Sequence, residues 1–265
     1  MPVFERNTVA LRYDDTGGDG PPLVFLHGWC DGRESWTATL EHFRGAYRCI
    51  APDMRGHGLS GLPRDHAYFP EALSGDVVAL CESLGVTRPV LIGHSFGGML
   101  AGFVAARFPG FARALVVEDQ ALDLRPLAGQ LRQVESVIFS ADQHMGFRDG
   151  LFDSMVTDRI SAEDRAGIHR LKRATPVEVG QALWAPLFAL TGAELGAVAE
   201  RLIGGLAGQP SLLVDAQPQP GYYEQVRAIA PDVEVEVLDC GHWTHLERPT
   251  EFRAAVSRFL ARVSV

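Results

Sequence analysis

The sequence predicts an α/β fold in which a mostly parallel central sheet is flanked by helices and carries an inserted group of helices. Short, uninterrupted apolar runs recur along the chain, as expected for strands buried on both faces of a parallel sheet. Helical patterns separate these runs, and this alternation favours right-handed parallel crossovers. Residues 121–195 break the alternation, because they hold helical patterns and no convincing strand. We therefore expect a core of residues 1–120 and 196–265, with residues 121–195 as a helical lid inserted after the strand ending near Val117.

The first half of the chain holds the clearest strand signals. Residues 8–13 alternate polar and apolar side chains, which indicates a half-buried strand, and a Gly/Pro-rich turn follows it. The run 23–26 is wholly apolar and predicts a buried strand. Hydrophobic periodicity predicts further strands at 47–51, 89–92 and 114–117, helices at 36–43, 72–84 and 96–108, and a loop at 52–58.

The alternation resumes after the predicted lid. Strands are expected at 211–214 and 233–238, with a helix at 222–230 between them. A last helix should start near Pro249, and its apolar stripe is typical of a helix laid on a sheet. The length of 265 residues suits one α/β domain with an insertion.

Composition excludes several classes of partner. The formal net charge of −9 argues against nucleic acid or an anionic membrane. The four cysteines, at 30, 49, 81 and 240, form no C-x-x-C pair, so neither a zinc site nor a redox motif is expected. The amino terminus lacks the apolar core of a secretory signal, and no apolar run approaches the roughly 20 residues of a membrane span. We expect reduced thiols, no metal or other cofactor, no membrane partner and a cytoplasmic location.

A G-x-S-x-G motif at 93–97 carries the strongest chemical signal. It follows the predicted strand 89–92 directly and precedes the helix 96–108. A serine at such a sharp strand-to-helix turn exposes its hydroxyl above the helix amino terminus, and the flanking glycines permit the turn. This context makes Ser95 the candidate nucleophile.

A serine hydroxyl is a poor nucleophile at neutral pH and needs a base within hydrogen-bonding reach. His242 follows the last predicted strand and Gly241, so we expect it to be that base. His245 is the competing candidate, to which we assign a structural role.

The sequence indicates the acid that should orient the histidine less clearly than it indicates the serine and the histidine. In this architecture it most often lies a few residues past strand 211–214, where Gln219 stands. Asp119, which follows strand 114–117, is therefore the expected acid. Asp215, Glu118 and a site without an acid remain open alternatives.

An oxyanion hole requires two backbone N–H donors near the serine. Phe96, the residue after the nucleophile, should supply one, and Trp29 in the loop after strand 23–26 the other. Aromatic and apolar side chains should line a pocket for a small apolar or aromatic substrate. The candidate pocket residues are Trp29, Cys30, Phe152, Trp184, Phe188 and Trp243.

Together these motifs resemble the α/β-hydrolase superfamily over nearly the whole chain except the lid. The resemblance rests on 27–29, 53–58, 93–97 and 241–242. It implies an α/β-hydrolase fold and, with the triad, hydrolysis of a carboxylic ester or lactone through an acyl-enzyme. Haloalkane dehalogenases and epoxide hydrolases need a carboxylate at position 95 and are disfavoured.

A narrower set of residues resembles cofactor-free dioxygenases of the 1H-3-hydroxy-4-oxoquinaldine 2,4-dioxygenase group. These residues are 28–30, 55–60, the acid before the lid, 217–218 and 223–224. The resemblance implies that His242 and Asp119 act as a base on a substrate hydroxyl, with O₂ uptake and release of carbon monoxide. Phe96 departs from that pattern, because the dioxygenase has a histidine there. This chemistry is the alternative function, and the oligomeric state is not predicted.

Overall fold

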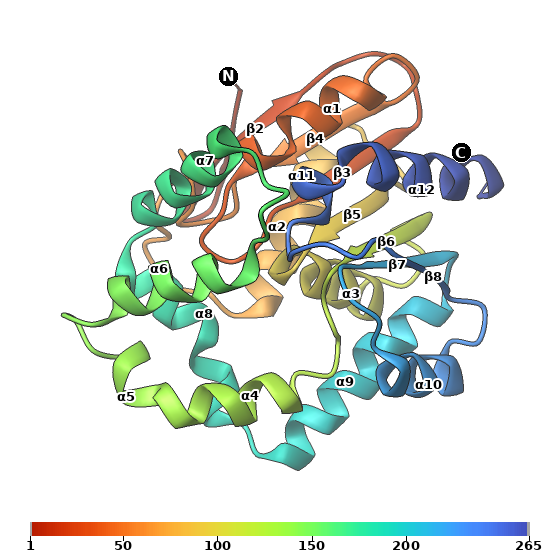
Figure 1. The fold of residues 1–265 in the computed structure, drawn as a ribbon. Helices are drawn as coiled ribbons and strands as arrows, with labels where there is room; N and C mark the ends of the chain where they lie inside the picture. Colours follow the sequence, from red (N-terminus) through yellow and green to blue (C-terminus); the bar gives the residue numbers. More distant parts are fainter. Residues whose placement is uncertain (1, 264–265) are drawn as a thin grey trace.

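The computed structural model describes residues 2–263, which form one eight-stranded sheet in the order β1-β2-β4-β3-β5-β6-β7-β8 (Figure 1). From β4 to β8 every neighbouring pair is parallel, which confirms the predicted mostly parallel sheet. The strands are β1 (Val3–Arg6), β2 (Val9–Asp15), β3 (Pro22–Leu26), β4 (Arg48–Pro52), β5 (Val90–His94), β6 (Ala114–Glu118), β7 (Ser211–Asp215) and β8 (Glu234–Val237).

Strand β1 was not predicted. It pairs antiparallel with β2, which is in turn antiparallel to β4, so the two strands form the antiparallel edge of the sheet. β1 is only four residues long and no residue in it is fully buried, so it lacks the apolar run that marks the central strands. Antiparallel edge strands on an otherwise parallel sheet are common in folds of this class.

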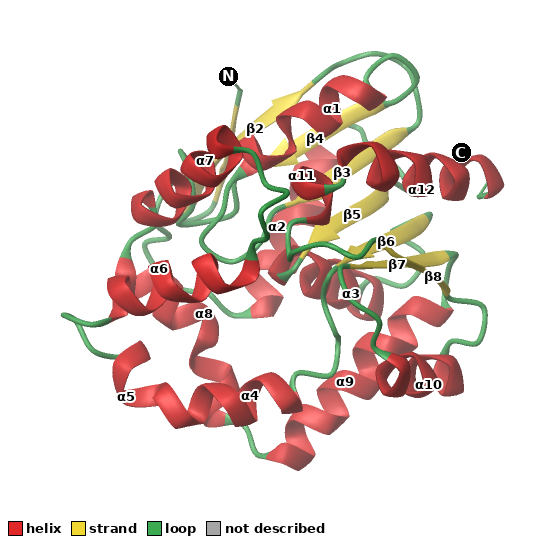
Figure 2. Cartoon of the chain, in the orientation of Figure 1, coloured by secondary structure: helices red, strands yellow, loops and turns green. Residues whose placement is uncertain are grey.

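Helices cover both faces of the sheet (Figure 2). On one face α1 (Thr37–Phe43) and the last helix, α12 (Pro249–Arg262), pack on the strands, with Phe252 and Phe259 fully buried. On the other face lie α2 (Pro70–Ser83), α3 (Phe96–Arg107), α9 (Gly192–Ala207) and α10 (Pro220–Ile229). Such double coverage explains why the central strands are apolar throughout.

Between β6 and β7 the structure places helices and no strand in the described chain. Five of them, α4 (Arg125–Leu131), α5 (Glu135–Ile138), α6 (His144–Met155), α7 (Ala162–Ala174) and α8 (Val177–Ala189), lie beyond the carboxyl ends of the parallel strands (Figure 1). The sixth, α9, starts inside the predicted lid range but packs along α3. The division into core and lid stays a prediction.

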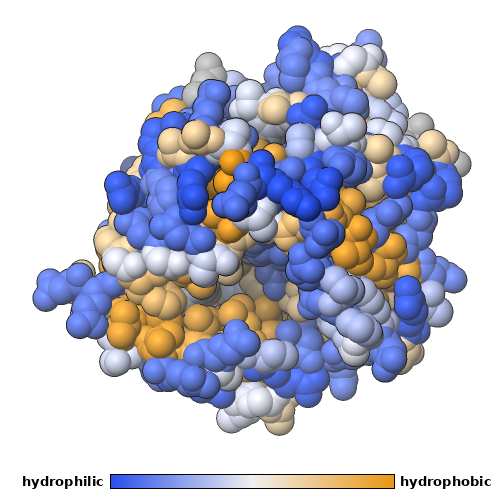
Figure 3. Space-filling model, in the orientation of Figure 1, coloured by the Kyte–Doolittle hydropathy of each residue, from blue (hydrophilic) through white to orange (hydrophobic). Residues whose placement is uncertain are grey.

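Apolar side chains gather on one face, where α4, α5 and α8 lie, beside a hollow in the surface (Figure 3). Within residues 2–263, no single helix has both the length and the apolar composition of a membrane span. Helices α8 and α9 meet those criteria only as a pair, and a bend of 109° separates them.

Candidate active site

Ser95 occupies the turn between β5 and α3, as the motif predicts. Its backbone has φ 52° and ψ −122°, a region that non-glycine residues rarely adopt and that costs about 1–3 kcal/mol. A Cβ at Gly97 would overlap the carbonyl of Leu26, so only glycine permits this close approach. The Ser95 N–H donates to the Glu118 carbonyl at 2.8 Å, which fixes the strained turn to β6.

His242 and Asp119 are in direct contact, although 123 positions separate them in the sequence. His242 Nδ1 lies 2.5 Å from Asp119 Oδ2, and each side chain is 16% exposed. The other carboxylate oxygen of Asp119 accepts a hydrogen bond from the Ala216 N–H at 2.8 Å, which fixes its orientation. The His242 N–H donates to the carbonyl of Met155, the last residue of α6, at 2.8 Å.

Glu118 and Asp215, the two alternative acids, do not contact His242. Glu118 is fully buried and accepts from Thr244 Oγ1 at 2.6 Å and from the His245 N–H at 2.8 Å. Its carboxylate also contacts His245 Nδ1 at 2.8 Å. Thus His245 has a structural partner of its own, as expected. Burial raises the pKa of Asp215 to about 7.

His94 is a site residue that the sequence analysis missed. Its Nε2 lies 3.0 Å from the carbonyl oxygen of His242, and the two rings are 4.6 Å apart. Burial, together with the neighbouring His242 and His245, holds the pKa of His94 well below its usual value, so the ring is neutral and Nε2–H donates. The hydrogen bond spans 148 positions, so no local pattern indicates it.

The loop after β3 lies directly beside the serine. A Cβ placed on Gly28 would lie 3.4 Å from Ser95 Cβ and 3.0 Å from His94 Nδ1, so a larger residue there would make a tight contact with both. Trp29 follows in the same loop. Phe96 is the first residue of α3, so its backbone N–H has no acceptor within the helix. The two expected oxyanion donors therefore belong to segments that flank Ser95.

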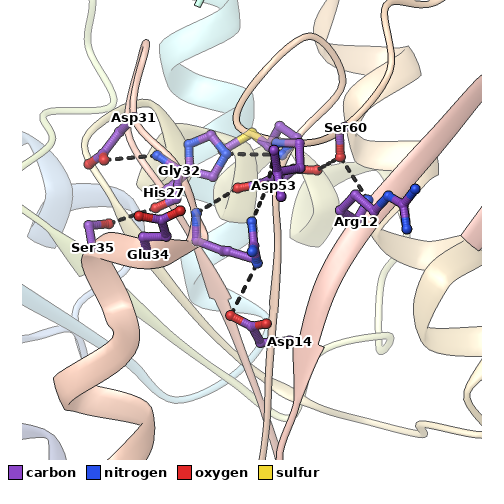
Figure 4. A network of polar contacts seen from close by, with 12 residues as sticks. Arg12, Asp14, His27, Asp31, Gly32, Glu34, Ser35, Asp53 and Ser60 are labelled. Carbon is purple, nitrogen blue, oxygen red and sulfur yellow. Dashed lines mark hydrogen bonds and ion pairs between the residues drawn. The ribbon is translucent and has the colours of Figure 1, made fainter. Parts of the chain in front are cut away.

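A buried polar network holds this loop in place (Figure 4). Asp53 accepts from the backbone N–H groups of Arg33 at 2.8 Å and Leu59 at 2.9 Å, and pairs with the Arg33 guanidinium. His27 Nε2 accepts from the Met54 N–H at 2.9 Å. These bonds join the loops after β3 and β4, and each buried polar group gains a partner.

Ser95, His242 and Asp119 line one cavity of about 620 Å³, a volume typical of small-molecule sites. Four of the candidate pocket residues, Trp29, Phe152, Trp184 and Trp243, line it. Trp29 is central to this wall: its ring stacks on Trp184 at 4.0 Å and on Phe152 at 5.7 Å. Its indole N–H donates to the Gly180 carbonyl of α8 at 2.9 Å.

Two predicted pocket residues do not line this cavity. Cys30 is fully buried behind the loop, where its Sγ faces Gly180, and burial raises its thiol pKa to about 12. Phe188 instead packs edge-on against Phe139 at 5.1 Å. The segments that contain Cys30 and Phe188 do line the cavity, but through the adjacent residues Trp29 and Leu187.

Two buried basic side chains, Arg148 and Lys172, lie behind the aromatic wall. Arg148 of α6 donates to the carbonyls of Lys172 at 2.6 Å and Thr175 at 2.8 Å. Nζ of Lys172 in α7 finds no hydrogen-bond partner among residues 2–263, and it lies 4.5 Å from the centroid of the Trp243 ring. Burial lowers the pKa of Lys172 to about 6.

No group of three or more His, Cys, Asp or Glu side chains among residues 2–263 is arranged to hold a metal ion. All four cysteines are unpaired and buried. The polar side chains that line the cavity beside Ser95 include Asp119, Gln120 and His242.

Comparison with known sequences gives a consistent family match. A model of the alpha/beta hydrolase family matches residues 23–255. The chain is 28% identical over 273 residues to the sn-1-specific diacylglycerol lipase ABHD11 of Mus musculus, covering 95% of this chain and 85% of that protein. It is 26% identical over 261 residues to the 2-hydroxymuconate semialdehyde hydrolase of Pseudomonas sp. (strain CF600), covering 92% and 88%.

Epoxide hydrolases match over a shorter segment. Epoxide hydrolase 1 of Caenorhabditis elegans is 36% identical over 110 residues, which is 41% of this chain. The matches cover only 27% of that protein and 30% of epoxide hydrolase 4 of Mus musculus.

Solved structures share the fold. The enol-lactonase from Burkholderia xenovorans LB400 has a TM-score of 0.77 at 20% identity, covering 98% of this chain and all of that one. An aryl esterase, described as putative, from Burkholderia cenocepacia has a TM-score of 0.80 at 22% identity, covering 96% and 95%.

Proposed function

Because the chain belongs to the alpha/beta hydrolase family, we propose that it hydrolyses a carboxylic ester or lactone through Ser95, His242 and Asp119. The contact between His242 and Asp119, in a cavity that Ser95 also lines, is the observation that carries the proposal. Position 95 holds a hydroxyl, which forms an acyl-enzyme. The carboxylate nucleophile that an epoxide hydrolase requires is missing there.

In the first half-reaction the Ser95 hydroxyl attacks the carbonyl carbon while His242 takes the hydroxyl proton. Asp119 stabilises the resulting imidazolium through Nδ1. The tetrahedral intermediate then expels the alkoxide, which receives the proton from His242. In a lactone this alkoxide remains attached to the acyl group.

In the second half-reaction, water attacks the acyl carbon and His242 takes the proton of that water. The second tetrahedral intermediate expels the Ser95 oxygen, which recovers its proton from His242. In both halves the N–H groups of Trp29 and Phe96 would bind the negative oxygen, and one such donor contributes about 3–4 kcal/mol.

His94 supports this chemistry as a positioning residue. Its neutral ring donates to the carbonyl of His242 and so holds the backbone that carries the proposed base. A charged ring at this place would repel the imidazolium that forms on His242. The depressed pKa of His94 therefore fits the proposed mechanism.

We propose that α4–α8 act as the lid over the cavity and that the substrate is small and apolar or aromatic. Side chains of these helices, among them Leu131, Phe152 and Trp184, line the cavity opposite Ser95. A largely apolar wall favours an alkyl or aromatic group by removing its surface from water. Unpaired, buried cysteines fit the expected cytoplasmic location.

The test is hydrolysis of a panel of p-nitrophenyl esters and lactones by the wild type and by Ser95→Ala. We expect the variant to lose about 10³-fold or more in kcat, since its nucleophile is gone. Unchanged turnover in Ser95→Ala would refute the acyl-enzyme. Circular dichroism of both proteins serves as the folding control.

One observation supports a second candidate, a cofactor-free dioxygenase. The proposed base pairs with Asp119, after β6, which is also the acid position of the family that residues 28–30 and 55–60 resemble. In that case His242 would deprotonate a 3-hydroxy-4-oxoquinoline-type substrate. Incubation with such a quinolone under O₂ separates the two: carbon monoxide release that needs His242 and survives Ser95→Ala would favour the dioxygenase.

A further inference from the structure

The cavity extends from Ser95 along helix α3 to Phe103, where basic side chains lie. Phe103 is eight positions beyond Ser95, so about 12 Å of helix separates them. Arg201 of α9 also lines the cavity, and its guanidinium carbon lies 5.9 Å from the centroid of the Phe103 ring. Arg201 is exposed, so it lies where the cavity meets the surface, beside Glu71, while Phe96, Met99 and Phe103 line the stretch of α3 that follows Ser95.

A second, smaller cavity of about 150 Å³ adjoins this end. Glu71, Phe103 and Arg201 line both cavities, and Arg107, at the end of α3, lines the second. Neither arginine forms an ion pair with any of residues 2–263. With Glu71 as the acidic neighbour, this end carries one positive charge in excess, on a chain whose formal net charge is −9.

We propose that Arg201, assisted by Arg107, binds a carboxylate at the far end of the substrate, so that the preferred ester or lactone is an amphiphile with a distal anionic group. The inference rests on the proposed ester hydrolysis at Ser95. The guanidinium fork matches carboxylate geometry, and its partner is supplied by the substrate. The apolar channel between the two ends holds the connecting chain.

The spacing sets the length of that substrate. The hydrogen bond between carboxylate and guanidinium takes up about 2.8 Å of the roughly 12 Å. An extended chain advances about 1.2 Å per bond, so the remaining distance is about eight bonds, which corresponds to an acyl group of about eight to ten carbons. Shorter chains would leave the carboxylate in the apolar channel, where an unpaired charge is costly. Longer chains would carry the carboxylate past Arg201.

The experiment compares mono-p-nitrophenyl esters of α,ω-dicarboxylic acids of four to twelve carbons with the matching ω-carboxamides. We expect the KM ratio of amide to acid to peak at eight to ten carbons, at about two- to fivefold. Arg201→Gln should bring the ratio close to one. Arg227→Gln should leave the ratio unchanged, because Arg227 is also an exposed arginine but lines neither cavity. Glu71→Gln should raise the ratio, and 1 M salt should lower it through screening.

A ratio near one in the wild type, or a ratio that Arg201→Gln leaves unchanged, would overturn the inference. The proposed function has a separate readout, because turnover of the neutral carboxamide esters depends on Ser95 and not on Arg201. If no ester is hydrolysed, calorimetry still tests the inference: the α,ω-dicarboxylic acid monoamide of about nine carbons should bind Ser95→Ala more tightly than the diamide does. Equal binding of the two ligands would refute it.

Discussion

His242 Nδ1 meets Asp119 Oδ2 at 2.5 Å, and this contact joins the loop after β8 to the end of β6, across the intervening strand β7. Strand β7 contributes to it directly, because the Asp119 N–H donates to the Val214 carbonyl at 2.9 Å and the Ala216 N–H donates to Asp119 Oδ1. Asp119 also has φ 43°, a backbone conformation that is costly without such support. The sheet thus holds the carboxylate where the imidazole needs it.

Asp119→Asn should lower kcat for ester hydrolysis by about 10³- to 10⁴-fold, because a neutral amide no longer stabilises the imidazolium or fixes its tautomer. Stopped-flow or steady-state assays measure this change. The matched control is Asp215→Asn at the neighbouring strand end, for which we expect less than about a threefold change, a limit well below the catalytic loss. If kcat fell more in Asp215→Asn than in Asp119→Asn, the assignment of Asp119 as the acid would be wrong.

Glu118→Gln should affect stability more than catalysis. The carboxylate accepts three donors from Thr244 and His245 while fully buried, and an amide presents an N–H₂ group to one of them. We expect the free energy of unfolding to fall by about 1–3 kcal/mol. Urea unfolding gives that value, and kcat per active site, normalised by titration, should stay within about fivefold. If Glu118→Gln had the same free energy of unfolding as the wild type, the buried network around Glu118 would not contribute to stability as proposed.

Lys172→Met should stabilise the protein. The folded-state pKa is lowered from about 10.5 to about 6 by burial, so between these pH values the unfolded chain binds a proton that the folded chain lacks. Stability of the wild type therefore rises with pH across this window, and the penalty is greatest below pH 6. We expect the free energy of unfolding of the variant to exceed that of the wild type by about 2–4 kcal/mol at pH 7. The lost contact of Nζ with the Phe152 and Trp243 rings partly offsets the benefit of removing the buried amine.

Denaturant unfolding between pH 6 and 10 measures this gain, which should shrink toward pH 10. Arg170→Met on the same helix is the control, because its ion pair with Glu34 is exposed and such pairs contribute less than about 1 kcal/mol. A gain that is independent of pH, or equal in both variants, would show that Lys172 is not the group responsible.

Gly28→Ala should impair catalysis with little effect on folding. The added Cβ would lie 3.0 Å from His94 Nδ1 and 3.4 Å from Ser95 Cβ, so the loop that carries the proposed oxyanion donor must shift. We expect kcat to fall by about tenfold or more, because a displacement of this size misaligns the donor. Gly45→Ala, whose Cβ would meet nothing within 4 Å, is the matched control for kcat and melting temperature.

Local patterns predicted the parallel strands, the elbow at Ser95 and the helical segment before β7, because each depends on periodicity or on turn residues close in sequence. Asp119 was the expected partner of His242, with Asp215 and Glu118 as alternatives, and the structure places Asp119 in contact with His242. The role of His94 could not be predicted, because its partner is a backbone carbonyl far along the chain.

Side-chain direction within a correctly predicted segment was harder to predict. Cys30 and Trp29 are adjacent, yet only the tryptophan faces the cavity, because positive φ at Cys30 turns the chain away. Lys172 lies among charged neighbours in α7, and the packing of α6 and the aromatic wall around it buries the amine. Such effects arise between elements and leave no periodic signal.

Covalent trapping tests the central claim most directly. The protein is incubated with a fluorophosphonate, which mimics the tetrahedral intermediate, and its intact mass and peptides are measured. We predict one adduct per chain, on the peptide that contains Ser95, lost in Ser95→Ala and strongly slowed in His242→Ala. An adduct on another residue, or ester turnover by a protein that remains unlabelled, would contradict the account.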